Sequence, residues 1–219
     1  MADLLPLFLN LSGRSVALVG GGRVAAGKLR QLVAVGAHVR VIAPEISSAI
    51  SSGRHPHVDL VQRAFVPADI DDVWLVVAAA TPDVNAAVAA AAESRRVFVN
   101  AVDDPANASA FLSGTVRRDG VTIAISTSGD APALTALVRE AVEALLPDDL
   151  DAWMEIARTT RLDWRRENVP MEERKPRLLR ALNARYERDP KTLEREASAE
   201  RSASANCVPW LNAPEDSWP

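Results

Sequence analysis

Two short stretches of the chain contain residue types that could bind or transform a ligand. The first is Gly20-Gly21-Gly22, which follows the apolar residues Val16–Val19 and leads into a small-residue segment ending at Lys28. A strand that ends in glycine and restarts as a helix leaves backbone N–H groups unbonded, and an anion usually binds there. The second is Asn100–Asp103, where a carboxylate follows an apolar run and could transfer a proton to or from a bound ligand.

The glycine stretch matches a known pattern for binding dinucleotides. Gly20, Gly22 and Ala25 fit G-x-G-x-x-A, which supplies a tight turn, close backbone approach to a pyrophosphate and close helix–strand packing. Its surroundings agree with this, because Ser15–Gly20 is predicted to be a buried strand and Arg23–Val35 an amphipathic helix. The context predicts dinucleotide binding; a plain tight turn is the alternative.

The end of the next predicted strand, His38–Pro44, indicates which dinucleotide is bound. No acidic residue stands at its tip, where an Asp or Glu usually binds the adenine ribose, but Glu45 lies just beyond. No arginine follows closely to bind a 2′-phosphate. The pattern therefore favours NAD over NADP.

Strands and helices alternate up to Asn100. Further strands are predicted at Val58–Arg63, Val73–Ala80 and Arg95–Asn100, with an alanine-rich helix over Val84–Glu93. This alternation is typical of an α/β protein with an open, Rossmann-type parallel sheet.

In such a sheet, ligands lie beyond the carboxyl ends of the strands. Gly20–Val24, Ala79–Thr81 and Asn100–Asp103 should converge there, which makes Thr81 a candidate cofactor-binding residue and Asp103 a candidate acid–base residue. The alternative for the carboxylates is structural: Asp103 or Asp104 would cap a turn before Pro105.

The pattern changes after Pro105. Thr115–Thr127 predicts a hairpin around Asp119-Gly120, and Ala131–Leu146 predicts an amphipathic helix. Helices rich in Arg and Glu are expected from Asp148 onward, with Trp153 and Trp164 as packing residues. The Ser-, Ala- and Pro-rich end of the chain predicts a disordered tail.

Composition excludes several classes of protein. The 219 residues are 48% hydrophobic and 25% charged with a net charge of −4, which gives no reason to expect a nucleic-acid partner. The N-terminal stretch is too short and too polar for a signal peptide or membrane span, so a cytoplasmic protein is expected. A single cysteine, Cys207, and three histidines argue against a disulfide or a metal site, and His55 and His57 are expected in a solvated loop.

Three segments together resemble the siroheme synthase N-terminal family. They are PLFLNLSGRSVALVGGGRVAAGK, AAESRRVFVNAVDDP and IAISTSGDAPALTALVREAVEALLP, and the match extends in order from about Leu5 to Pro147. The resemblance implies oxidation of precorrin-2 to sirohydrochlorin by NAD; bifunctional members also insert Fe²⁺. Since no methyltransferase motif follows, the chain resembles the stand-alone form of this enzyme.

The resemblance also implies the domain organisation and a homodimer. A Rossmann-type domain would span residues 1–113, a small dimerisation region 114–147 and a helical C-terminal domain 148–190, followed by the tail at 191–219. The functional aspartate of the family falls on Asp103. Its cofactor contacts fall on Gly20, Gly22, Arg23, Val24, Pro44 and Glu45.

Other residues keep two interpretations. Ser126, Thr127 and Ser128 could bind a substrate carboxylate or cap the following helix. Arg117, Arg118 and Arg139 could bind substrate carboxylates or be solvated surface residues. From a different functional class, a non-catalytic NAD-binding sensor would keep the glycine turn but would not need Asp103.

Overall fold

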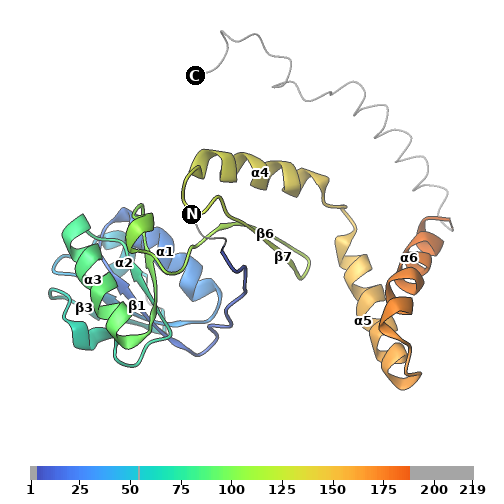
Figure 1. Cartoon of the computed structure of the whole chain (residues 1–219), viewed down its shortest axis with the longest axis horizontal. Helices are drawn as coiled ribbons and strands as arrows, with labels where there is room; N and C mark the ends of the chain where they lie inside the picture. The colour runs from blue at the N-terminus through green and yellow to red at the C-terminus, as the bar shows by residue number, and fades with distance from the viewer. Residues whose placement is uncertain (1–3, 54, 188–219) are drawn as a thin grey trace, which may run out of the picture. The chain divides into compact units, whose positions relative to one another are not determined.

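A five-stranded parallel sheet organises the N-terminal part of the chain (Figure 1). The structure is a computed structural model that describes residues 4–53 and 55–187. The strand order is β3-β2-β1-β4-β5. The strands are β1 (Ser15–Val19), β2 (His38–Ile42), β3 (Val58–Val61), β4 (Leu75–Ala78) and β5 (Phe98–Ala101). This order confirms the predicted Rossmann-type sheet.

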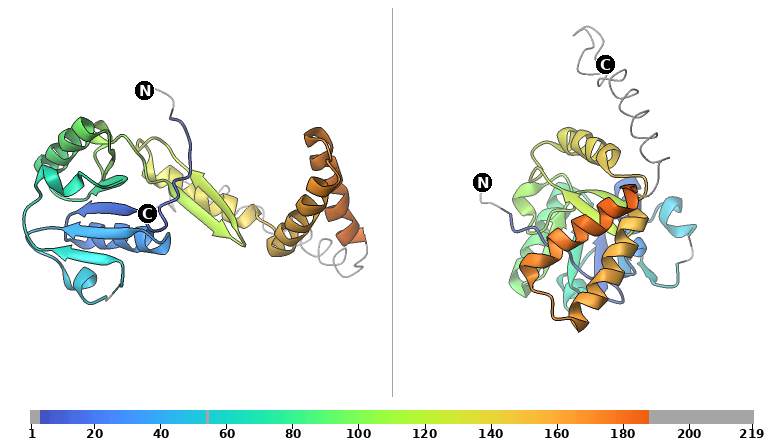
Figure 2. Two further views of the ribbon diagram at one scale, coloured as in Figure 1. Left: turned by 90° about the horizontal axis from the view of Figure 1, so that it is seen from below. Right: turned by 90° about the vertical axis from the view of Figure 1, so that its right-hand side faces the viewer.

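Helices cover both faces of this sheet, and Figure 2 shows the strands lying side by side between them. The elements that connect the strands are α1 (Arg23–Ala34), α2 (Ser48–Ser51), η1 (Pro67–Ile70), α3 (Pro82–Arg95) and η2 (Pro105–Asn107). The hydrophobic pattern of the sequence predicted α1 and α3 but not the short helices α2, η1 and η2. One-turn helices leave too few residues to show a hydrophobic period.

The two sheet faces build two apolar cores because side chains alternate along each strand. Val16 and Leu18 of β1 pack with Leu29 of α1, while Val19 packs on the other face with Val88 of α3. All these side chains are buried. The backbone register places Val16 between Val39 of β2 and Leu75 of β4, which aligns the carboxyl ends of the strands at one edge.

A two-stranded hairpin follows the sheet, as predicted. Its strands are β6 (Gly114–Arg118) and β7 (Val121–Ile125), and its turn is Asp119-Gly120. Both turn residues have positive φ, at 49° and 85°, which matches the right-handed twist of the hairpin and explains the Asp-Gly pair. Helix α4 (Pro132–Leu145) comes next.

The chain divides into two compact units whose limits differ from the predicted domain boundaries. The first unit contains the chain up to Val116 and Ile123–Ala144; the second contains Arg117–Thr122 and the chain from Leu145. Helix α4 therefore belongs with the parallel sheet, and only the hairpin tip belongs with the helical part. Sequence composition could not locate this division, because it depends on contacts between residues far apart in the chain.

The second unit contains a pair of helices, α5 (Leu150–Arg166) and α6 (Met171–Glu187). They are joined by polar contacts at one end: Trp153 Nε1 donates to the Tyr186 hydroxyl at 2.5 Å, and that hydroxyl lies 3.1 Å from Asp149 Oδ1. Burial, more than any other effect, raises the pKa of Tyr186. A helical C-terminal region is thus present, and Trp153 joins its two helices. The predicted tail at 191–219 lies outside the described residues, as does Cys207.

Candidate functional site

Three loops meet at the carboxyl edge of the sheet and continue its hydrogen bonding. The Gly20 amide donates to Ile42 O at 2.9 Å, the Ala79 amide donates to Val19 O at 2.8 Å, and the Val102 amide donates to Ala78 O at 2.9 Å. The segments that the sequence predicted to converge therefore leave the sheet from adjacent strands.

Two of the three glycines in the turn are required by close packing. A Cβ atom on Gly20 would lie 2.2 Å from Ala79 O, and the φ of Gly20 is +132°, which L side chains rarely adopt. A Cβ atom on Gly21 would lie 1.9 Å from Glu45 O. The turn thus lies directly against the loops that follow β4 and β2. The motif had assigned no role to Gly21, since its contact is with a residue far away in the sequence.

Gly22 differs, because a Cβ there would meet no described atom within 4 Å. It is the N-cap of α1, and the described residues provide no side-chain cap and no acidic residue in the first turn of that helix. A helix N-terminus of this kind favours a bound anion. The open face at Gly22 and the uncapped helix fit the pyrophosphate of a dinucleotide.

The other predicted cofactor residues surround this turn. Arg23 and Val24 are exposed on the first turn of α1, and Pro44 and Glu45 are exposed after β2. The Ser47 amide donates to Gly21 O at 2.9 Å, and this hydrogen bond holds the loop after β2 against the glycine turn. Thr81 is exposed at the N-cap position of α3.

Asp103 has a strained backbone, whereas Asp104 makes the turn contacts. Asp103 has a φ of +57°, in the left-handed region, which is uncommon for a residue other than glycine. Asn107 Nδ2 donates to Asp104 Oδ2 at 2.8 Å, and the Asn107 amide donates to Asp104 O at 3.2 Å. No hydrogen bond or ion pair to the Asp103 carboxylate is formed within residues 4–53 and 55–187. The structural role expected for one of these two carboxylates is thus performed by Asp104.

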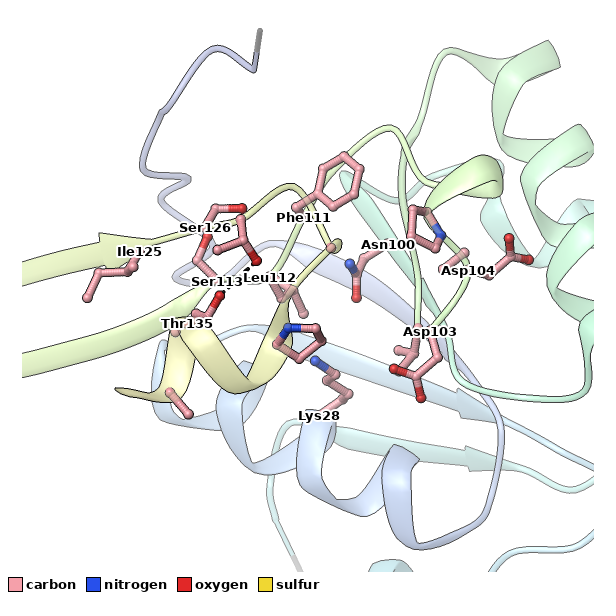
Figure 3. A pocket seen from close by; sticks show the side chains of 18 of the residues that line it. Lys28, Asn100, Asp103, Asp104, Phe111, Leu112, Ser113, Ile125, Ser126 and Thr135 are labelled. Atoms are coloured by element: carbon pink, nitrogen blue, oxygen red, sulfur yellow. Dashed lines mark hydrogen bonds between the residues drawn. The ribbon is translucent and has the colours of Figure 1, made fainter. Parts of the chain in front are cut away.

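A cavity of about 590 Å³ lies beside Asp103 (Figure 3). Its walls come from α1, from residues 100–105 after β5, from residues 111–114, and from the segment that joins β7 to α4. Aliphatic and aromatic side chains such as Phe111, Leu112 and Ile125 alternate with polar ones. All of these elements belong to the first compact unit.

Lys28 of α1 also lines this cavity and was not among the predicted site residues. It is half-buried; burial lowers the pKa of its ammonium group, and the Asp103 carboxylate acts in the opposite direction. One signal in the sequence could have identified it. Lys28 follows Ala25 by three residues and precedes Leu32 by four, so it shares the buried face of α1, where a lysine is unusual.

Asn100 contributes a buried amide to the cavity wall. Its Nδ2 donates to Ala110 O at 2.9 Å, which fixes the orientation of the amide, and its Oδ1 accepts no hydrogen bond from the part of the chain that is described. Figure 3 shows Asn100 between Phe111 and Lys28.

The predicted hydroxyl residues lie on the segment that joins β7 to α4. Ser126 and Thr127 line the cavity, but Ser128 is not among the lining residues. Thr127 Oγ1 accepts from the Ala131 amide at 3.2 Å and lies 3.0 Å from Thr135 Oγ1, while Ser126 Oγ accepts from the Ser128 amide at 3.1 Å. Both hydroxyls thus stabilise the turn before α4, and both are also at the cavity.

The candidate arginines differ in their positions. Arg139 lines the cavity, and its guanidinium pairs with Glu143 at 2.6 Å and with Glu140 at 3.4 Å. Arg117 and Arg118 do not line it, and Arg118 instead donates to Leu146 O at 3.0 Å.

Within the described residues, neither the histidines nor the helices form a metal site or a membrane span. His38 and His57 stack with their ring centroids 4.4 Å apart. Among the described residues, no three His, Cys, Asp or Glu side chains lie close enough together to hold a metal ion. Every helix within residues 4–53 and 55–187 is too short or too polar to span a bilayer.

Comparisons with known proteins agree with this architecture. Residues 7–114 match a family model described as "Putative NAD(P)-binding", which indicates a nicotinamide dinucleotide, and residues 118–145 match "Sirohaem biosynthesis protein central". Among solved structures, "SirC, precorrin-2 dehydrogenase" superposes with a TM-score of 0.65 at 22% identity, covering 90% of this chain and all of that one. That likeness supports the fold.

The curated relatives are longer chains that this one matches in part. "Siroheme synthase" of Photorhabdus laumondii is 37% identical over 84% of this chain, and "Siroheme synthase 3" of Aeromonas hydrophila is 40% identical over 68%. The chain spans 40% and 32% of their respective lengths. With both family models matched in the expected order, the chain belongs to the siroheme synthase N-terminal family.

Proposed function

We propose that the chain is an NAD-dependent precorrin-2 dehydrogenase, which oxidises precorrin-2 to sirohydrochlorin in siroheme biosynthesis. One observation carries the proposal: α1 begins at the dinucleotide-type glycine turn and also lines the cavity that contains Asp103. A cofactor bound at the turn and a substrate bound in the cavity would therefore share one helix. The names of the siroheme synthase relatives and of SirC support this substrate class.

The oxidation removes the equivalent of a hydride and a proton from the macrocycle, so each needs an acceptor. NAD⁺, when bound, supplies the hydride acceptor. Asp103 supplies the proton acceptor: its carboxylate lines the cavity and forms no hydrogen bond to the described chain. The left-handed backbone of Asp103 fixes the point from which this side chain projects.

NAD, rather than NADP, is the cofactor that we propose. The exposed Glu45 carboxylate follows β2, and its backbone carbonyl packs under Gly21 of the turn. A negative charge at this position disfavours the 2′-phosphate of NADP, and a carboxylate can accept a hydrogen bond from a ribose hydroxyl.

An anaerobic assay with precorrin-2 tests the proposal. Turnover with NAD, followed through the absorbance of the reduced cofactor and of sirohydrochlorin, is the expected result, with weaker turnover for NADP. NAD binding without turnover would favour the sensor interpretation. Adding Fe²⁺ to the sirohydrochlorin product tests the second activity that bifunctional members of the family possess.

A homodimer formed through residues 114–147 is the assembly that we propose. Helix α4 has no buried residue in the described chain, and its Leu134 and Leu137 side chains are 51% and 46% exposed. An amphipathic helix with uncovered leucines on its surface is suited to pairing with a second copy. The cytoplasm remains our proposal for where the protein acts.

A further inference from the structure

Lys28 is a charged residue of the cavity that the reaction described above does not use. It projects from α1, and Figure 3 shows it below Asn100, with Asp103 to its right in the view. From Gly22 to Lys28 the helix rises about 9 Å, at ~1.5 Å per residue. The lysine therefore lies well away from the position where a pyrophosphate would meet the turn. Residues 20–24 are not among those that line the cavity.

The positive charge of Lys28 has no partner in the described part of the chain. No carboxylate lies within 4.0 Å of it, and it donates no hydrogen bond there. The second cation at the cavity, Arg139, is already held by Glu143 at 2.6 Å. Lys28 is thus a half-buried cation in a cavity whose other cation is neutralised.

A group in this position favours an anionic ligand. Burial lowers the pKa of the Lys28 ammonium. Within the described residues, the Asp103 carboxylate is the charge that raises this pKa, and it lies beyond ion-pair distance. A carboxylate that entered the cavity would restore the interactions that burial removes, and charge-assisted hydrogen bonds of this kind are among the strong ones.

We propose that Lys28 binds a carboxylate of the tetrapyrrole substrate and thereby orients the macrocycle relative to Asp103. The inference rests on the proposed function, in which the substrate is a polycarboxylate. Lys28 is a substrate-binding residue in this proposal, whereas the proton acceptor remains Asp103. This contact would be additional to any made by Ser126, Thr127 and Arg139, which also line the cavity.

Three variants on one helix test the proposal. Lys28→Met keeps the length of the apolar stem and removes the charge, Lys28→Arg keeps the charge, and Arg30→Met removes an exposed charge elsewhere on α1. Each variant is titrated separately with sirohydrochlorin and with NAD. Thermal melting of the same samples verifies that the variants fold.

Loss of tetrapyrrole affinity with NAD affinity retained is the expected pattern. Lys28→Met should weaken sirohydrochlorin binding about tenfold or more, the range for losing a hydrogen bond to a charged group, while NAD affinity stays within about twofold. Lys28→Arg should recover most of the loss, and Arg30→Met should bind both ligands like the wild type. Unchanged sirohydrochlorin binding by Lys28→Met would overturn the proposal, as would a loss confined to NAD.

The same titrations separate this inference from the proposed function. If the wild type binds sirohydrochlorin but does not oxidise precorrin-2, the proposed function fails, and the affinity of Lys28→Met still decides the role of the lysine. If the wild type binds no tetrapyrrole, both are overturned.

Discussion

Asp103 has a strained backbone, and its carboxylate forms no hydrogen bond or ion pair with the rest of the described chain. Its φ of +57° costs free energy in most residues, although Asp and Asn tolerate this region better than others. Its neighbour Asp104 makes the hydrogen bonds to Asn107 that stabilise the turn. At the residue scale, the turn contacts are made by Asp104, and the adjacent Asp103 is the side chain that we propose for the chemistry.

Replacing Asp103 should therefore affect turnover more than stability. Asp103→Asn retains the size and the left-handed preference of the side chain but cannot accept a proton, so turnover of precorrin-2 should fall by about a hundredfold or more. The melting temperature should stay close to that of the wild type. Steady-state kinetics and thermal melting of the same sample measure both.

Asp103→Gly provides the control for backbone strain. Glycine adopts positive φ readily, so this variant should melt at or above the wild-type temperature while losing turnover as Asp103→Asn does. Full turnover per folded molecule in either variant would mean that Asp103 is not the proton acceptor.

A second carboxylate, Asp69, has a structural role that pH can reveal. It is 5% exposed, and Arg63 holds it through contacts of 2.5 and 2.8 Å, while the Val66 amide donates to it at 2.9 Å. The Arg63 hydrogen bond is the largest effect on the pKa of Asp69, and that pKa lies below its ordinary value even though burial opposes the shift.

Stability should therefore depend on the ionisation of Asp69 in acid. A lowered pKa in the folded state stabilises the protein above the unfolded pKa of about 4, and this contribution disappears as pH falls through the folded value. Asp69→Asn should lower the melting temperature at neutral pH, and its deficit should shrink in acid. The control Asp59→Asn, at an exposed site on β3, should follow the wild type; a deficit of Asp69→Asn that stays constant with pH would contradict this role.

At the scale of elements, the turn between β1 and α1 contains glycines with different tasks. Gly21 touches the loop after β2, whereas Gly22 faces open space at the N-terminus of α1. The first is a packing requirement, and the second leaves room for a ligand.

Substitutions at Gly22 and Gly21 should affect different properties, cofactor binding at Gly22 and stability at Gly21. Gly22→Asp places a side chain and a negative charge where the pyrophosphate would approach, so NAD binding should be nearly abolished while the melting temperature changes little. Gly21→Ala puts a Cβ against the Glu45 carbonyl and should lower the melting temperature instead. Calorimetric titration with NAD and thermal melting distinguish them; a folded Gly22→Asp variant with wild-type NAD affinity would show that the cofactor does not use this turn.

At the scale of the whole molecule, the uncovered surface of α4 determines the expected assembly. Leu134 and Leu137 are about half exposed, and Leu145 at the end of the helix is 81% exposed. Burying a leucine side chain contributes ~1.5–3 kcal/mol, so burial of these leucines against a second copy would favour the homodimer that we propose.

Light scattering should give the mass of a dimer of the 23.5 kDa chain at micromolar concentration. Leu137→Glu should shift it toward the monomer, because a charge would have to be buried in the interface. Glu140→Gln, at an exposed position of the same helix, should leave the dimer intact. A monomeric wild type would contradict the homodimer.

The sequence by itself determined the features that depend on neighbouring residues. The alternation of strands and helices predicted the parallel sheet, G-x-G-x-x-A predicted the turn before α1, and Asp119-Gly120 predicted the hairpin. Such features follow from backbone conformational preference and from the period of apolar residues, both of which act within a few positions.

Tertiary structure decided the features that depend on residues far apart in the chain. Lys28 and Asn100 became candidates only when α1, the end of β5 and the segment before α4 enclosed one cavity. Asp103 and Asp104 could be told apart only because the structure shows Asp104 in contact with Asn107. Glycine is needed at position 21 because the carbonyl of Glu45 packs against it. The sequence shows which residue types could take part in binding or catalysis. The burial of a side chain, its distance from a ligand and its other hydrogen-bond partners are defined only when the chain has folded.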